Sequence, residues 1–150
     1  MQNLTIDTGM KEYLINNRAV LRFNPGDPNL YHRFFAAAPQ LDALDAELTE
    51  RLKALPAEPD PARAEQGLAL LNDYDRRIKA LLTEIFGEEN NFDKVLEGVN
   101  LAGTGANGKR VAQNLLDALT PILQDGAAQH LQSTAAAARA EADAARAARG

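Results

Sequence analysis

Apolar and polar residues alternate through the first part of the chain, from residue 3 to residue 23. The apolar members of this pattern are Leu4, Ile6, Tyr13, Ile15, Ala19, Leu21 and Phe23. A period of two is typical of β-strands with one buried face. Thr8-Gly9 and Asn16-Asn17 are predicted turns, because Gly and Asn tolerate a positive φ. The segment is therefore expected to form an antiparallel hairpin or a three-strand meander.

The pattern changes to a helical period after Phe23. Asp27 followed by Pro28 predicts a helix start, because an Asp side chain can cap the first turn and proline already has a helical φ. The predicted helix spans residues 28–55, with a kink or a restart at Pro39. Leucines then recur every three or four residues, which predicts one apolar stripe on a charged helix. This leucine stripe consists of Leu41, Leu44, Leu48, Leu52 and Leu55.

Three further helices are predicted after a loop that contains Pro56, Pro59 and Pro61. They span residues 62–86, which Gly87 is placed to end, residues 92–97, and residues 109–125, where Pro121 would introduce a bend. A glycine-rich loop over residues 98–108 separates the last two. The expected inward-facing residues are Leu71, Tyr74, Ile78, Leu81, Leu82 and Ile85 in the first of these helices, and Val111, Leu115, Leu116, Leu119 and Leu123 in the last.

Residues 133–149 consist almost entirely of Ala, Arg, Glu and Asp. Ala favours helix, but no bulky apolar residue anchors the segment, so a helical or disordered tail is expected over residues 126–150. The patterns together predict a mainly α (α+β) fold. It has an N-terminal hairpin or meander, a bundle of about four helices, and an Ala-rich C-terminal helix or tail. Residues 1–125 are expected to form one compact domain.

Composition and charge narrow the possible partners. Aromatic residues make up 5% of the 150 residues and Trp is absent, so Leu, Ile, Val and Ala must build the core. A net charge of −5 without a basic stretch makes nucleic acid an unexpected partner. No apolar run approaches the roughly 18 residues that cross a membrane, and the N-terminus lacks a signal-peptide layout. No membrane contact is expected, and the expected location is the cytosol.

One stretch invites comparison with a phosphate-binding loop. The residues from Gly103 to Lys109 have the spacing GxxxxGK. Arg110, however, stands where Ser or Thr would hold magnesium, and the preceding residues predict a helix rather than a buried strand. A flexible linker between helices is the favoured interpretation. A nucleotide hydrolase that uses this loop is the weaker alternative.

Other arrangements of reactive side chains are incomplete. His32 and His130 are the only histidines and lie far apart in sequence, whereas a metal site needs three or four convergent ligands. Neighbouring carboxylates such as Glu88-Glu89 are interpreted as solvated helix faces. Ser133 is the only serine, and no Ser/His/Asp set can be assembled around it. We therefore expect no catalytic residue, no metal and no cofactor, and a protein that is not an enzyme.

Several short strings resemble a known family. In chain order they are Asp7-Thr8-Gly9 with Glu12-Tyr13, Phe23-Asn24-Pro25 with Asp27, Arg76, Ile85-Phe86-Gly87, Asn100, and Asn114-Leu115-Leu116. Through them, residues 4–124 resemble an uncharacterised family encoded in tail-gene clusters of phages and prophages of Gram-positive gut bacteria. The glycine-rich loop over residues 103–108, the absence of Trp and the Ala/Arg tail set this chain apart from that family.

Members of that neighbourhood are usually taken to be tail assembly chaperones of long, non-contractile-tailed phages. The resemblance implies a homo-oligomer in the cytoplasm of the bacterial host that binds the phage tape measure protein, with the tail tube protein as a further candidate partner. Such binding uses apolar grooves or helix faces, and the leucine stripe from Leu41 to Leu55 is the predicted surface for the partner. The hairpin edge and the same stripe are the places where subunits of the oligomer could join. The alternative is a structural virion component, such as a head–tail connector or tail terminator.

Overall fold

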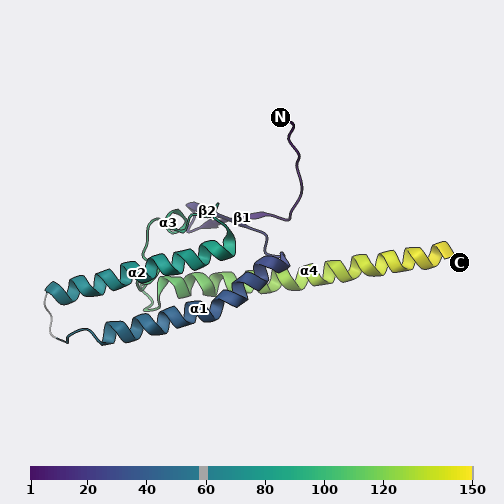
Figure 1. Ribbon diagram of the computed structural model, residues 1–150. Coiled ribbons are helices and arrows are strands. Elements are labelled where there is room, and N and C mark those ends of the chain that lie inside the picture. Colours follow the sequence, from purple (N-terminus) through teal and green to yellow (C-terminus); the bar gives the residue numbers. More distant parts are fainter. Residues whose placement is uncertain (58–60, 150) are drawn as a thin grey trace.

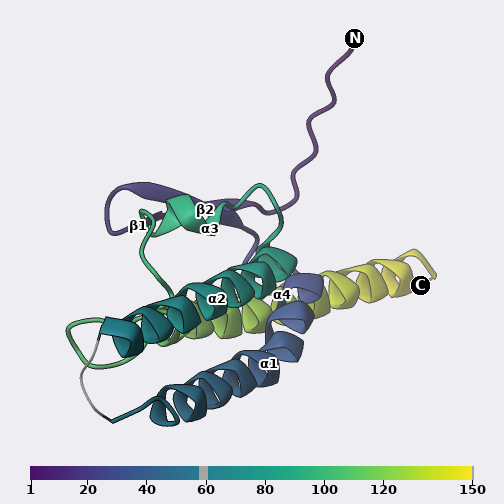
Figure 2. The ribbon, with the colours of Figure 1, turned by 60° about the vertical axis from the view of Figure 1, so that its left-hand side comes forward.

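The computed structural model describes residues 1–57 and 61–149 and forms one elongated, mainly helical molecule (Figure 1). Its elements are β1 (Lys11–Ile15), β2 (Ala19–Phe23), α1 (Pro28–Lys53), α2 (Pro61–Phe86), α3 (Phe92–Val95) and α4 (Val111–Arg149). The helices α1, α2 and the first half of α4 lie side by side, and the hairpin and α3 lie together against this helical layer (Figures 1 and 2). The predicted mainly α fold with an N-terminal hairpin is confirmed.

The hydrophobic core fills the space where the long helices meet the hairpin. A cluster of aromatic rings joins these elements, with ring centroids 5.2 Å apart between Phe23 and Phe86 and 5.8 Å apart between Phe86 and Phe92. Such pairs add stability beyond the burial of their area. All the inward-facing residues predicted for α2 and α4 are buried or half-buried, so the helical periods were interpreted correctly.

The hairpin forms because its turn residues accept an unusual backbone conformation. Asn16 and Asn17 have φ values of 53° and 61°, and the backbone N–H of Arg18 donates to the carbonyl of Ile15 at 3.1 Å. Asn reaches positive φ at little cost, and this turn matches the twist of antiparallel strands. The turn predicted at these two residues is confirmed.

The alternative of a three-strand meander is wrong, because residues 1–10 belong to no strand. The carboxylate of Asp7 accepts a hydrogen bond from the N–H of Gly9 at 2.9 Å, and the Asn24 side chain donates to the carbonyl of Thr8 at 2.7 Å. Gly9 itself has a φ of 77°. These interactions turn the chain away from the hairpin, so residues 1–10 project from the molecule as an exposed segment, called the arm below (Figure 1).

The ends of α1 and α2 follow local rules. The Asp27 side chain accepts from the N–H of Asn29 at 2.9 Å, which caps α1 as predicted. Gly87, with a φ of 95°, ends α2. The helix α1 continues through Pro39 and changes direction in its first half, which agrees with a kink rather than a restart (Figure 2). Pro59 of the predicted loop lies outside the described residues.

The helix α4 is longer than the sequence pattern predicted. The expected end at residue 125 is wrong, because the helix continues without a break to Arg149. Gly126 allows the backbone of Pro25 to pack directly against this helix, where a Cβ would overlap the proline carbonyl. Beyond that crossing the Ala-rich sequence sustains the helix, and residues 128–149 are exposed. Of the two forms expected for the tail, the structure has the helix.

Buried polar side chains fasten the smaller elements to the helices. The Asn90 side chain accepts from the N–H of Arg22 at 2.9 Å and donates to the carbonyls of Arg22 and Phe86 at 2.8 and 2.9 Å. Asp75 accepts from the N–H of Leu101 at 2.7 Å and from Lys79 at 2.8 Å. These bonds hold β2 on the end of α2, and they hold the loop after α3 on its middle.

Candidate protein-binding cleft

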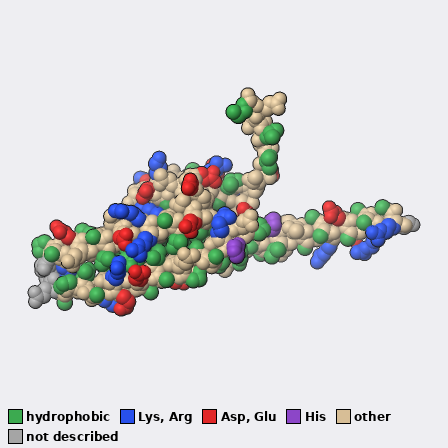
Figure 3. All heavy atoms as spheres, viewed as in Figure 1, with side chains coloured by type: hydrophobic (Ala, Val, Ile, Leu, Met, Phe, Trp, Pro, Cys, Tyr) green, Lys and Arg blue, Asp and Glu red, His purple; other side chains and the backbone are tan. Residues whose placement is uncertain are grey.

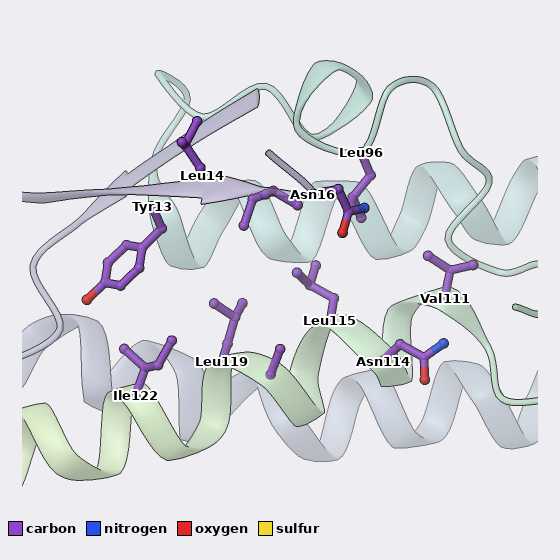
Figure 4. Close-up of a pocket in the computed structure, with 11 residues that line it drawn as sticks. Tyr13, Leu14, Asn16, Leu96, Val111, Asn114, Leu115, Leu119 and Ile122 are labelled. Carbon is purple, nitrogen blue, oxygen red and sulfur yellow. The ribbon is translucent and has the colours of Figure 1, made fainter. Parts of the chain in front are cut away.

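An apolar cleft of about 460 Å³ separates β1 from α4 (Figure 4). We call it the hairpin cleft. It forms because the hairpin is fastened through β2 to α2 and α3, whereas β1 stands above α4 without closing onto it. Its lining residues come from β1 and its turn, from the end of α3, and from one face of α4. They are Tyr13, Leu14, Ile15, Asn16, Leu96, Val111, Asn114, Leu115, Ala118, Leu119 and Ile122.

The α4 side of the hairpin cleft is a regular helix face. Val111, Leu115, Ala118, Leu119 and Ile122 recur at steps of three and four, which places them on one side of the helix. Leu115 and Leu119 are buried and form the floor, whereas Ala118 is exposed at the rim. The floor is therefore part of the core, and the rim is open to a partner.

The β1 side of the cleft is fixed by an aromatic stack. The ring of Tyr13 lies 4.7 Å from that of Phe23 at an interplanar angle of 14°, and burial raises the pKa of its hydroxyl. Ile15 is half-buried on the same face, while Leu14 points away from α4 and is exposed (Figure 4). The alternation of β1 thus directs two apolar side chains toward α4.

No charged residue is among the described residues that line the hairpin cleft, and the polar side chains of its lining are Asn16, Asn114 and, with its hydroxyl, Tyr13. The Asn114 side chain accepts a hydrogen bond from Asn107 at 2.9 Å, so it is held against the glycine-rich loop. Burying apolar side chains here would cost no desolvation of charge. The arrangement is suited to binding an apolar polypeptide segment.

The predicted leucine stripe lies elsewhere, along α1 and largely inside the molecule. Leu41 and Leu48 are buried in the core, with exposed fractions of 7% and 0%, and Leu44 and Leu52 are half-buried against it. These four leucines pack α1 onto the neighbouring helices. In this conformation the buried part of the stripe offers little surface to another protein.

Leu55, at the end of the stripe, is also half-buried, but it does not pack against the core. It lines a shallow hollow together with Gln66, Ala69 and Leu70 of α2, and Leu68 nearby is exposed. Whether the leucine stripe from Leu41 to Leu55 binds a partner stays a prediction.

The stretch from Gly103 to Lys109 has the geometry of a closed loop between α3 and α4. The N–H of Gly105 donates to the carbonyl of Lys109 at 2.8 Å, and the N–H of Lys109 donates to the Asn107 side chain at 3.1 Å. These amides are engaged within the loop, whereas a phosphate-binding loop directs its amides at the ligand. The predicted linker between helices is what the structure contains.

The two histidines lie on different helices, and neither they nor the carboxylates of the described residues form a metal site. His32 is exposed on α1, as is His130 on α4. Among residues 1–57 and 61–149, no three His, Asp or Glu side chains lie close enough together to hold a metal ion. Within the same residues, no helix is long and apolar enough to span a membrane.

Sequence reasoning missed the hairpin cleft even though it found both of its sides. The alternation at Tyr13 and Ile15 and the helical stripe from Val111 to Leu119 were each interpreted as core-facing. No sequence signal states that two such faces stand apart. Ala118 next to Leu119 is the one local hint, because a small side chain leaves room beside a large one.

Comparisons with protein-family models, with curated proteins and with solved structures find no match to this chain.

Proposed function

We propose that this protein is a phage tail assembly chaperone-like protein, which binds an apolar segment of the helical tape measure protein in the hairpin cleft. The tail tube protein is a further candidate partner, and the host cytoplasm is the place of action. The observation that carries the proposal is the cleft itself, an uncharged apolar surface open to solvent between β1 and α4. Amphipathic helices bind by laying their apolar face in such grooves.

The resemblance to the tail-module family supports the choice of partner. A tape measure protein is long and helical, so it exposes apolar faces until the tail tube surrounds it. A chaperone for it needs a surface that binds apolar side chains and releases them during assembly. An open cleft without charged lining residues supplies such a surface.

Co-expression with the tape measure protein of the same phage or prophage tests the proposal. Ala118→Arg places a long charged side chain in the cleft from an exposed helical position, so the fold should persist. Ala137→Arg, at an exposed position near the other end of α4, is the matched control. We expect the wild type and Ala137→Arg to copurify with the tape measure protein and to keep it soluble, and Ala118→Arg to fail.

Two results would contradict the proposal. If the wild type neither copurifies with the tape measure protein nor increases its soluble fraction, this chaperone function is wrong. If Ala118→Arg behaves like the wild type, the hairpin cleft is not the binding surface. Mass spectrometry of purified phage particles separates the structural alternative, because a virion component stays in the particle and a chaperone does not.

A further inference from the structure

The arm is an extended apolar segment that the molecule itself leaves uncovered. Leu4 and Ile6 are 83% and 75% exposed, and in an extended chain residues two apart point to the same side. Apolar side chains follow one another along the arm, which stands clear of the body (Figure 3). A segment with this alternation is suited to pairing as a strand with one buried face.

One edge of the hairpin is open to receive such a strand. The sheet contains β1 and β2 only, within the described part of the chain. On the outer side of β2, the Asn90 side chain is hydrogen-bonded to both the N–H and the carbonyl of Arg22. In the part of the chain that the structure describes, no side chain is hydrogen-bonded to the backbone of β1 in this way, and the hairpin cleft lies beneath that strand (Figure 4). A free strand edge above an apolar cleft is a template for strand addition.

The arm of the same copy is directed away from this edge. Thr8 is bonded to Asn24, which follows β2, so the arm leaves the hairpin on the side opposite to the free edge of β1. Gly9 packs so closely on Asn24 that a Cβ would lie 2.8 Å from its amide nitrogen. Within one copy, the arm thus has no partner strand and the edge of β1 stays free. The arm of one copy can pair with the free edge of another.

We propose that the arm of one copy adds as a strand to the free edge of β1 in a second copy, with Leu4 and Ile6 in the hairpin cleft. The lengths agree, because β1 has 5 residues and the arm supplies a strand of the same length over residues 3–7. The charges agree as well. The one charged side chain of residues 3–7 is Asp7, which in a strand points to the side opposite to Leu4 and Ile6, and the lining of the cleft carries no charge.

The inference shares the cleft with the proposed function but does not depend on the tape measure protein. Self-association is measured with this chain alone. The arm would occupy the cleft while no tape measure protein is present, and the tape measure protein would compete with it. The arm of a neighbouring copy is therefore expected to occupy the site that the tape measure protein would otherwise fill.

Light scattering on the full-length chain over a range of concentrations tests this addition of the arm to a second copy. We expect the wild type and Ala137→Arg to associate. Leu4→Asp/Ile6→Asp, which alters only the exposed arm, and Ala118→Arg, which blocks the cleft, should each stay monomeric alone. An equimolar mixture of these two variants should form a heterodimer, because the first keeps a free cleft and the second keeps an intact arm. Backbone amides of residues 3–7 should be protected from hydrogen exchange only in the associated state.

Three outcomes would overturn the inference. One is a wild type that stays monomeric at every concentration. Another is association of the arm variant to the same extent as the wild type. The third is protection of the arm amides in a monomer, which would mean that the arm covers the cleft of its own chain. The arm variant keeps the cleft unchanged. Its co-purification with the tape measure protein therefore tests the proposed function alone, whatever the outcome for self-association.

Discussion

Gly126 controls how closely the chain entering α1 approaches α4. A Cβ at this position would overlap the backbone of Pro25, which precedes α1, and a backbone cannot move aside as the end of a flexible side chain could. We expect Gly126→Ala to lower the free energy of unfolding by about 1–3 kcal/mol, in spite of the better helix propensity of Ala. Urea denaturation followed by circular dichroism measures the change.

Gly67 of α2 provides the matched control. A Cβ there would meet only the Leu55 side chain, at an ordinary 3.6 Å. Gly67→Ala should therefore raise the free energy of unfolding by up to about 1 kcal/mol through helix propensity. Equal stability of the two variants would mean that Pro25 does not pack on α4 as described.

Lys79 of α2 joins Asp75 of the same helix to Asp93 of α3. Its ammonium lies 2.8 Å from both Asp75 and Asp93, and the side chains of Lys79 and Asp75 are only 12% and 11% exposed. Removing one partner of a buried pair leaves the other charge uncompensated. We expect Lys79→Met to lower the free energy of unfolding by about 3 kcal/mol. Asp93→Asn, at an exposed carboxylate, should cost less than about 1 kcal/mol.

The same ion pair gives the stability a dependence on alkaline pH. Burial lowers the pKa of Lys79, but the hydrogen bonds and charges of Asp75 and Asp93 together raise it above its ordinary value of 10.5. The folded state thus holds this proton more tightly than the unfolded state. The contribution of the pair is complete below pH 10.5 and is lost as the pH rises through the higher folded-state pKa.

Unfolding of the wild type and of Lys79→Met at several pH values measures this loss. The stability difference between them should be constant between about pH 7 and 9 and should shrink above the ordinary lysine pKa. Comparison with the variant removes the effect of Tyr13 and Tyr74, whose pKa values burial also raises. A difference that shrank already between about pH 7 and 9 would contradict the assignment.

Among the elements, the hairpin depends on one side chain for its attachment to α2. Asn90 is buried, and its side-chain amide is hydrogen-bonded to backbone groups of Arg22 and Phe86. Asn90→Ala would leave these backbone groups without partners, at a cost of about 2–3 kcal/mol. Amides of β1 and β2 should then exchange faster than those of α1, as measured by hydrogen exchange with mass spectrometry.

Asn90→Asp is the sharper companion variant. It keeps the acceptor for the Arg22 N–H and loses the donor to both carbonyls, with hardly any change in shape. The hairpin amides should again exchange faster. If neither variant changes their exchange relative to α1, the hairpin is held by the aromatic cluster rather than by Asn90.

Element ends were predictable from sequence wherever their causes are local. Asp27 caps α1 through a residue two positions away, and Gly87 ends α2 through its own φ. Asn16 and Asn17 likewise form their turn without help from distant residues. Local chemistry of this kind needs only the neighbouring sequence, so the order and the type of the elements were correct.

The mistaken and missing features depend on residues far apart in the chain. The arm takes its course from Asn24, 16 residues beyond Thr8, and α4 passes position 125 against the distant Pro25. The hairpin cleft exists because Asn90 holds β2 on the end of α2, whereas β1 stands apart from α4. Hydrophobic periods identify faces that become buried, but they do not state which faces meet.

For the molecule as a whole, the second half of α4 is expected to add no stability. Residues 128–149 are exposed, so a chain ending at Gln132 should keep the wild-type unfolding midpoint while losing helical circular dichroism. A chain ending at Thr120 lacks Leu123, which is fully buried, and should be strongly destabilised. A shift of the midpoint in the first truncation would show that the projecting helix packs on the body.

The unbroken α4 also sets how the molecule moves through solution. Its 39 residues span about 58 Å at 1.5 Å per residue, whereas a compact chain of 150 residues has a radius of gyration of about 15 Å. Such a shape raises the frictional coefficient, so a single copy should elute from a gel-filtration column ahead of spherical standards of its mass. Rotation about the long axis should be faster than end-over-end tumbling, which NMR relaxation of amides along α4 would resolve.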